Sequence, residues 1–200
     1  MMGNFWAAAA AIAFLVGPAH AASHLAVGEG APSLPAWVTF CTQQPEECAV
    51  DRAEPAEITL SSETVELIEA VNRHVNSTLT PMTDQAHWQL VDQWNIPTDG
   101  TGDCEDFQLL KRKLLVEAGL PRRALRITVV LNEQGEGHAV LMVRTTAGDF
   151  ILDNLQRSVL IWDRTGYRFI KRESDNHVGW VSFTPVPATD AAAEVSSLFH

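Results

Sequence analysis

The chain has 200 residues, of which 46% are hydrophobic, and a formal net charge of −11 from 14 basic and 25 acidic residues. This length and apolar content suffice to bury the core of one domain, which excludes wholesale disorder. The acidic balance argues against nucleic acid or an anionic membrane surface as a partner, because both require clustered Lys and Arg side chains.

Residues 1–22 are predicted to be a signal peptide, which implies export to the periplasm. An apolar run over residues 7–16 is followed by Ala-His-Ala at residues 19–21, a small-x-small cleavage pattern. No Lys or Arg precedes the run, so an uncleaved single-pass anchor is the alternative. The run is shorter than the roughly 20 residues that a bilayer requires, which favours cleavage.

The remaining chain is predicted to hold one domain over residues 37–184, between two less ordered segments. Residues 23–36 are rich in Gly, Pro and Ala and are predicted to be a flexible lead-in. Residues 185–200 are predicted to be a C-terminal tail. Within the domain, residues 37–60 are expected to be irregular.

Three cysteines occur in the chain. Cys41 and Cys48 are close enough to close a small loop, and in an oxidising compartment we expect them to form a disulfide. The alternative is two unpaired thiols, whereas a zinc site lacks two further well-spaced ligands. Cys104 is then left unpaired, and an odd thiol in an exported protein is either a small buried hydrophobe or a reactive group.

Two helices are predicted in the first half of the domain. The first begins at Ser61, where a Ser-Ser-Glu-Thr sequence can cap it, and ends near residue 76. A shorter ordered piece follows over residues 84–94, and then a turn-rich loop over residues 98–103. The second helix spans residues 104–118, with Asp103 as N-cap and Gly119 as the stop. Its predicted apolar stripe consists of Phe107, Leu110, Leu114 and Ala118.

The second half of the domain changes to the two-residue period of strands. Strands are predicted over residues 125–131, 138–144, 149–154, 159–162, 167–171 and 180–183. Helices followed by a meander of strands indicate an α+β fold, in which the helix that begins at Cys104 packs on an antiparallel sheet.

Cys104 is the first residue of its predicted helix. The partial positive charge and free N–H groups of a helix N-terminus favour a thiolate and can bind an oxyanion. Asp103, Glu105 and Asp106 flank the thiol, however, and three carboxylates so close would raise its pKa. Either these side chains only cap the helix and face water, or a hard cation such as Ca²⁺ lies among them.

His138 and Asp153 are predicted to meet on neighbouring strands. If the turn after Arg144 places that residue opposite Asp149, residue 140 pairs with Asp153. His138 and Asp153 are then diagonal neighbours on one face, roughly 7–8 Å apart at the backbone. A shift of one residue would separate them, so the prediction depends on the register.

The order Cys104, His138, Asp153, on a helix and two strands, is that of papain-related acyl-transfer enzymes. In that chemistry the Cys thiolate attacks a carbonyl and forms an acyl-enzyme. The His protonates the leaving amine and then activates water, and the Asp orients the His.

Three motifs also resemble a known family. Gly-Asp-Cys-Glu-Asp-Phe at residues 102–107, continuing with Leu-Lys-Arg at 110–112, is followed by Gly-His-Ala-Val-Leu at 137–141 and Leu-Asp-Asn at 152–154. In this order they are similar to the bacterial transglutaminase-like cysteine proteinases, whose LapG-type members are periplasmic proteases that clip large surface adhesins. The resemblance runs from about Trp37 to Trp180. It includes the two early cysteines and a series of Asn, Asp and Trp residues between positions 72 and 94.

This resemblance implies a papain-like fold and catalytic roles for Cys104, His138 and Asp153. It also implies calcium at Asp103 and Glu105, with Asp106 as a further candidate ligand. Trp94 is a candidate oxyanion-hole donor, with a core aromatic as the alternative. The implied partners are a protein substrate such as a surface adhesin and a membrane-bound regulator.

Two other functions fit the same residues. A protein-glutamine transglutaminase or amidase would use the same triad, which cannot distinguish water from an amine as the acyl acceptor. A binding domain that keeps the fold without turnover is disfavoured by the intact Cys, His and Asp. A zinc hydrolase is weaker still, because the chain has no His-x-x-x-His pair or clustered Cys pattern. A chemical test on Cys104 separates the enzymes from the binding domain.

Overall fold

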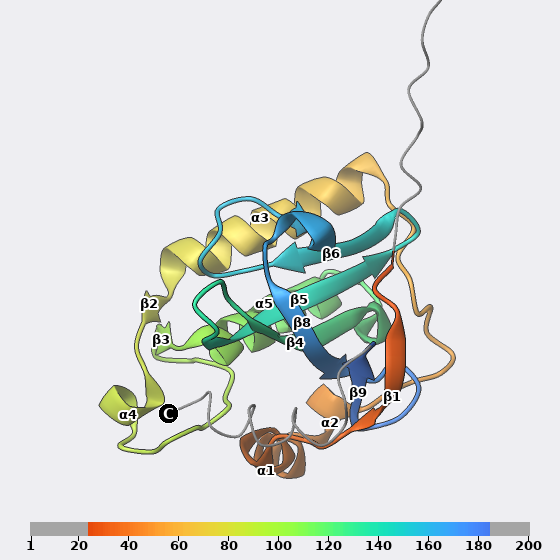
Figure 1. Ribbon diagram of the computed structural model, residues 1–200. Helices are drawn as coiled ribbons and strands as arrows, with labels where there is room; N and C mark the ends of the chain where they lie inside the picture. The colour runs from red at the N-terminus through yellow and green to blue at the C-terminus, as the bar shows by residue number, and fades with distance from the viewer. Residues whose placement is uncertain (1–23, 185–200) are drawn as a thin grey trace, which may run out of the picture.

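The computed structural model describes residues 24–184, so the predicted signal peptide and C-terminal tail lie outside the described residues. Seven strands form one antiparallel sheet in the order β1-β9-β8-β4-β5-β6-β7 (Figure 1). The strands are β1 (Val27–Ala31), β4 (Leu125–Leu131), β5 (Gly137–Thr145), β6 (Gly148–Leu152), β7 (Leu160–Ile161), β8 (Arg168–Glu173) and β9 (Trp180–Phe183). The α+β prediction is confirmed, and β4 to β7 form a meander as predicted, whereas β8 returns to pair with β4 instead of β7.

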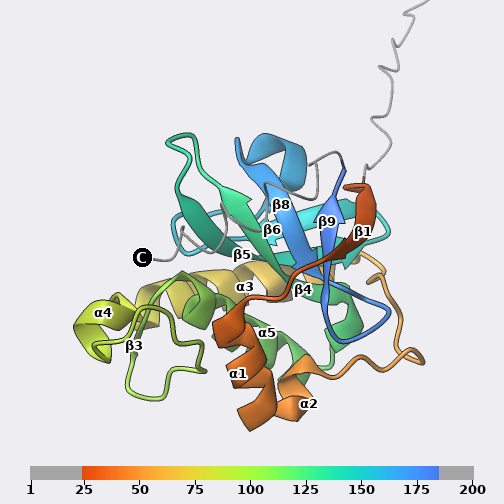
Figure 2. The ribbon, with the colours of Figure 1, turned by 60° about the horizontal axis from the view of Figure 1, so that its bottom comes forward.

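The helices α1, α3 and α5 lie on one face of this sheet (Figure 2). The helical elements are α1 (Pro35–Gln43), α2 (Pro45–Cys48), α3 (Ser62–Thr78), α4 (Asp84–His87), α5 (Cys104–Glu117), η1 (Arg122–Ala124) and η2 (Trp162–Arg164). A separate parallel pair joins β2 (Thr80–Pro81) to β3 (Thr101–Gly102) just before α5. Among residues 24–184, no helix combines the length and apolar content needed to cross a membrane.

The N-terminal part of the domain is more ordered than predicted. Residues 27–31 form the edge strand β1 instead of a flexible lead-in, with Ala31 opposite Trp180 on β9. Residues 37–60 are not irregular throughout, because they include most of α1 and all of α2. Both helices begin at a proline, which is suited to the first helical position because its missing N–H would have no partner there. The predicted disulfide between Cys41 and Cys48 links the two helices.

Helix α3 begins as predicted, since the Ser61 side chain accepts a hydrogen bond from the Thr64 backbone N–H at 3.2 Å. Helix α5 differs from its predicted single stripe. It packs against β4, β5 and α3, so it is buried on several sides. Phe107, Leu109 and Leu115 are fully buried, whereas Leu110 and Leu114 are only half-buried and Ala118 is exposed. Each fully buried large side chain contributes about 1.5–3 kcal/mol, which fixes the helix against the sheet.

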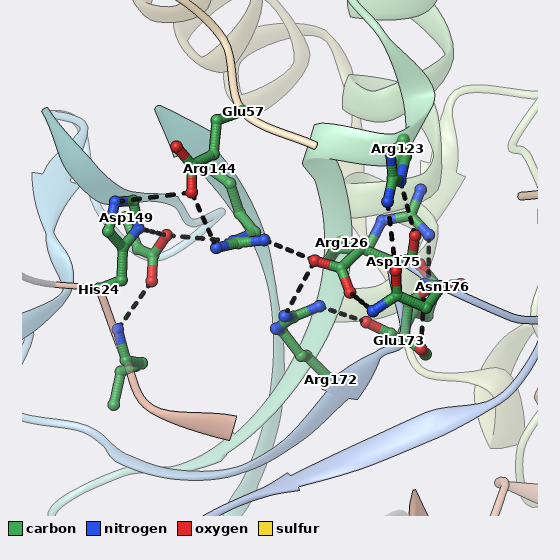
Figure 3. A network of polar contacts seen from close by, with 12 residues as sticks. His24, Glu57, Arg123, Arg126, Arg144, Asp149, Arg172, Glu173, Asp175 and Asn176 are labelled. Atoms are coloured by element: carbon green, nitrogen blue, oxygen red, sulfur yellow. Dashed lines mark hydrogen bonds and ion pairs between the residues drawn. The ribbon is translucent and has the colours of Figure 1, made fainter. Parts of the chain in front are cut away.

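The two ends of β5 have different environments. His138 lies near the start of the strand, and Arg144 lies near its end, inside a network of ion pairs (Figure 3). The Arg144 guanidinium donates to Asp175 at 2.5 Å and to Glu57 at 3.1 Å. His24 joins the same network through Asp149, at 2.9 Å. The network therefore ties the first described residue to the sheet at the end remote from His138.

Candidate active site

Cys104 opens α5 at the point where the helix meets β5. Its side chain is half-buried, and its Sγ donates to the Glu105 carboxylate at 3.2 Å. The Ala139 backbone N–H donates to the same sulfur. Because Ala139 directly follows His138, this contact brings the thiol to the start of β5, where the predicted base lies.

The register that the sequence predicted for the next hairpin is confirmed. Arg144 faces Asp149 and Leu141 faces Leu152. His138 and Asp153 are both buried, and the Nε2 of the His is 2.8 Å from an Oδ of the Asp. The hydrogen bond to Asp153 uses Nε2, so Nδ1 is the ring nitrogen left for another partner. The structure thus brings all three predicted triad residues to one end of the sheet.

Three further groups hold Asp153 in place. The Tyr167 hydroxyl donates to its second carboxylate oxygen at 2.6 Å, and the Leu155 backbone N–H donates to the first at 2.9 Å. The Asn76 side chain donates to its carbonyl at 2.8 Å. Burial alone would raise the pKa of Asp153, but the hydrogen bonds from His138 and Tyr167 lower it below its usual value. The carboxylate is therefore ionised and oriented. Tyr167 was not predicted, since its sequence position indicated only the start of a strand.

The thiol of Cys104 is not activated by the helix alone. Burial raises its pKa well above the usual range, and the nearby carboxylates of Glu105 and Asp103 raise it further. These charges oppose the helix N-terminus, which favours the thiolate. A compensating positive charge is required before Cys104 can ionise near neutral pH.

The carboxylates near Cys104 form a compact group that differs from the predicted ligand set. Asp84, Asp103 and Glu105 each offer an oxygen within 4.8 Å of the others. Asp106, a predicted candidate ligand, is outside this group because it accepts hydrogen bonds from the Asn95 backbone at 2.9 Å and the Asn95 amide at 3.1 Å. Asp84 was not predicted as a ligand. It comes from α4, which the β2–β3 pair brings alongside the start of α5.

Asp103 and its neighbours fit a cation better than simple helix caps. The Asp103 side chain makes no capping hydrogen bond, and its buried Oδ1 has no hydrogen-bond partner among the described residues. Burial raises the pKa of Asp103 to about 6 and also raises that of Glu105. Without a cation, burial therefore disfavours the ionised form of both carboxylates. A hard divalent ion would instead keep them ionised and use the orphan oxygen.

Asp106 and Gly102 form a tight contact beside this group. Burial raises the pKa of Asp106 to about 8. A Cβ on Gly102 would lie 2.8 Å from the carboxylate of Asp106, so only glycine fits there. Asp106 is therefore a structural residue that holds the loop through Asn95.

Trp94, the candidate oxyanion donor, lies in the hydrophobic core. Its ring packs edge-to-face on Trp180 with centroids 6.2 Å apart, and its side chain is almost fully buried. Its Nε1 has no hydrogen-bond acceptor among residues 24–184. The core position and the unused N–H leave its role in the oxyanion hole a prediction.

Lys111 is a buried cation on α5, behind the triad. Its Nζ has no hydrogen-bond acceptor in the described part of the chain, and its side chain is fully buried. Burial lowers its pKa from 10.5 to about 7, while Asp153 partly offsets this shift. Below that pH the ammonium is present in both the folded and unfolded states, so the desolvation cost lowers the free energy of unfolding in full. The cost declines as the pH rises towards 10.5.

Substitution of Lys111 by Met should therefore stabilise the fold, on the order of a few kcal/mol at about pH 6. The methionine side chain has a similar length but carries no charge that must be buried. We expect the variant to have a higher Tm than the wild type, with a difference that shrinks as the pH rises. Lys113→Met, at a half-exposed position of the same helix, is the control. A lower Tm for Lys111→Met at about pH 6 would contradict the claim that the buried ammonium of Lys111 destabilises the fold.

Comparisons with known proteins show the family of the chain. The family model described as bacterial transglutaminase-like cysteine proteinase BTLCP matches residues 29–186. No curated protein sequence matches the chain. The structure of calcium-bound LapG from Legionella pneumophila is 27% identical, covers 66% of this chain and 77% of its own, and has a TM-score of 0.52. Another LapG structure from that organism is 24% identical over 68% of this chain and 77% of its own, with a TM-score of 0.51.

Proposed function

Because the chain belongs to the bacterial transglutaminase-like cysteine proteinases, we propose that it is an exported endopeptidase that cleaves a periplasmic or surface protein with Cys104, His138 and Asp153. The observation that carries the proposal is the hydrogen bond of 2.8 Å between His138 and Asp153. The residue after this His, Ala139, donates its backbone N–H to the Cys104 sulfur. The family assignment supports cysteine peptidase chemistry.

In the proposed reaction the Cys104 thiolate attacks the scissile carbonyl, while His138 holds the proton that left the sulfur. The oxyanion lies at the N-terminus of α5, where backbone N–H groups are available. His138 then gives its proton to the leaving amine, and the C–N bond breaks to leave an acyl-enzyme. His138 next takes a proton from water, whose oxygen attacks the acyl carbon. The C–S bond then breaks, the second product leaves as a carboxylic acid, and the proton on His138 is again shared with the Cys104 sulfur.

We also propose that calcium assists this enzyme. Asp84, Asp103 and Glu105 would hold the ion through their oxygens, which are the ligands that calcium prefers. Its positive charge would offset the carboxylates that raise the pKa of the Cys104 thiol. The similarity to calcium-bound LapG, at 27% identity, supports this assignment.

Chelation should therefore lower both stability and activity. We expect EGTA to lower the Tm and the rate of substrate cleavage, and Ca²⁺ but not Mg²⁺ to restore both, because Mg²⁺ demands a smaller octahedral site. Asp84→Asn should raise the calcium concentration needed for half-maximal recovery by about 10-fold or more. Asp51→Asn, an exposed carboxylate elsewhere, is the control. An unchanged Tm and cleavage rate in EGTA would contradict calcium binding by these three carboxylates.

The location and partners follow from the same reasoning. We propose a periplasmic location because residues 1–22 are predicted to be a signal peptide. We propose a large surface adhesin as the substrate and a membrane-bound protein as a regulator, on the sequence resemblance alone.

The proposed function can be tested in cells that express either the wild type or Cys104→Ala. The surface and secreted proteomes of the two strains are compared. A shortened protein present only with the wild type would identify the substrate and demonstrate hydrolysis. A larger conjugate present only with the wild type would instead indicate transamidation, and identical proteomes would contradict a peptidase role.

A further inference from the structure

A polar groove lies beside the loop that carries Asp153. It has a volume of about 380 Å³ and runs between the C-terminal half of α3 and the chain that follows β6. Figure 1 shows these two segments side by side. The lining residues are Arg73, Asn76, Ser77, Asn154, Leu155, Gln156 and Arg157. The size falls within the range of ligand pockets, which is about 300–1,000 Å³.

The charge of the groove is opposite to that of the protein. Two arginines and no carboxylate line it, although the whole chain has 25 acidic and 14 basic residues. Arg157 is exposed, and no carboxylate among the described residues pairs with it. Arg73 pairs with Glu69 at 3.1 Å, but both side chains are about half exposed, so water screens the pair. Both guanidinium groups are therefore available to an anionic ligand.

The other polar groups add donors and connect the groove to the triad. Asn154 accepts a hydrogen bond from Gln108 through its oxygen at 3.3 Å, which leaves its amide N–H groups as donors. Asn76 donates to the carbonyl of Asp153 at 2.8 Å and to that of Gln156 at 3.1 Å. The chain that follows the catalytic Asp thus lines the groove, and Asn76 of the groove also helps to hold that Asp. Because Asn154 directly follows Asp153, the groove begins at the residue next to the triad.

We infer that this groove is a specificity subsite that binds an Asp or Glu side chain of the protein substrate. Guanidinium groups and amide donors match a carboxylate, which accepts bidentate hydrogen bonds from arginine. The inference rests on the proposed endopeptidase function, because it assigns the groove to the same substrate. It predicts that cleavage sites carry an acidic residue at a fixed distance from the scissile bond.

The test uses the calcium-loaded mature enzyme and a library of peptides from a digested bacterial proteome. Cleavage sites are read by mass spectrometry for the wild type, Arg73→Gln/Arg157→Gln and the control Arg52→Gln, an exposed arginine on the loop between α2 and α3. The wild type and control should prefer Asp or Glu at one position by about 10-fold, the effect of two partly exposed ion pairs. The double variant should lose this preference while its Tm and its cleavage of neutral sites stay unchanged. High salt should weaken the preference of the wild type.

Two results would overturn the subsite. One is a wild-type profile without enrichment of Asp or Glu, and the other is an enrichment that persists in the double variant. A wild-type enzyme that cleaves no member of the library would count against the proposed endopeptidase function instead.

Discussion

Replacement of Cys104 by Ala is expected to lower kcat/KM for the identified substrate by about 10⁶-fold, because the loss of a triad nucleophile removes the covalent pathway. We expect the thiol to contribute little to the stability of the fold. Its side chain is half-buried, and it donates a hydrogen bond to Glu105, which is itself part of the site. The Tm of the variant should stay close to that of the wild type. The measurement is cleavage of the purified substrate at saturating calcium.

Calcium binding provides the matched control for this variant. Cys104→Ala should bind calcium as the wild type does, because the proposed ligands Asp84, Asp103 and Glu105 are retained. An inactive variant with an unchanged Tm and calcium response has lost chemistry alone. Residual cleavage near the wild-type rate would remove Cys104 from the mechanism.

Substitution of Asp153 by Asn should lower kcat by about 10⁴-fold, because an amide cannot hold the imidazole of His138 in the required tautomer or stabilise the imidazolium. The change keeps the size of the side chain. His138, Tyr167 and the Leu155 N–H all donate to this carboxylate. The NH₂ group of Asn cannot accept hydrogen bonds, so at least one of these donors would lose its partner. We therefore expect a loss of stability of about 1–3 kcal/mol as well.

Tyr167→Phe separates the two effects. It removes one hydrogen bond to Asp153 but keeps the contact between Asp153 and His138. It should cost stability of about 1–3 kcal/mol with a far smaller loss of kcat. Equal losses of kcat in Asp153→Asn and Tyr167→Phe would mean that Asp153 acts through packing rather than through His138.

The sequence predicted the strands from β4 to β7 and the register between β5 and β6 because turn residues separate strongly alternating segments there, but not the return of β8 to β4. Once Arg144 faces Asp149, the meeting of His138 with Asp153 follows from the two-residue period. The helix start at Cys104 was equally predictable, from the flanking Asp103 and the later glycine stop. These features depend on neighbours that are near in the chain.

The features that were missed depend on distant neighbours. Strand β1 contains glycines and a glutamate and has little strand propensity of its own, so its pairing with β9 could not be read locally. Asp84 joins Asp103 only because β2 and β3 pair, although Thr80 and its partner Thr101 are far apart in the chain. Tyr167, directly before β8, reaches Asp153 only in the folded chain. In each case tertiary packing brings the residue to its place.

The central claim is that His138 holds Cys104 as a thiolate, and the rate of alkylation by iodoacetamide tests it directly. Cys104 is the only free thiol, since the chain has three cysteines and the other two form a disulfide. In calcium-loaded protein at about pH 6.5, Cys104 of the wild type should react at least about 100-fold faster than in His138→Ala. A thiol of ordinary pKa is about 1% ionised there, and burial lowers that fraction further. Equal rates in the two proteins would contradict the account.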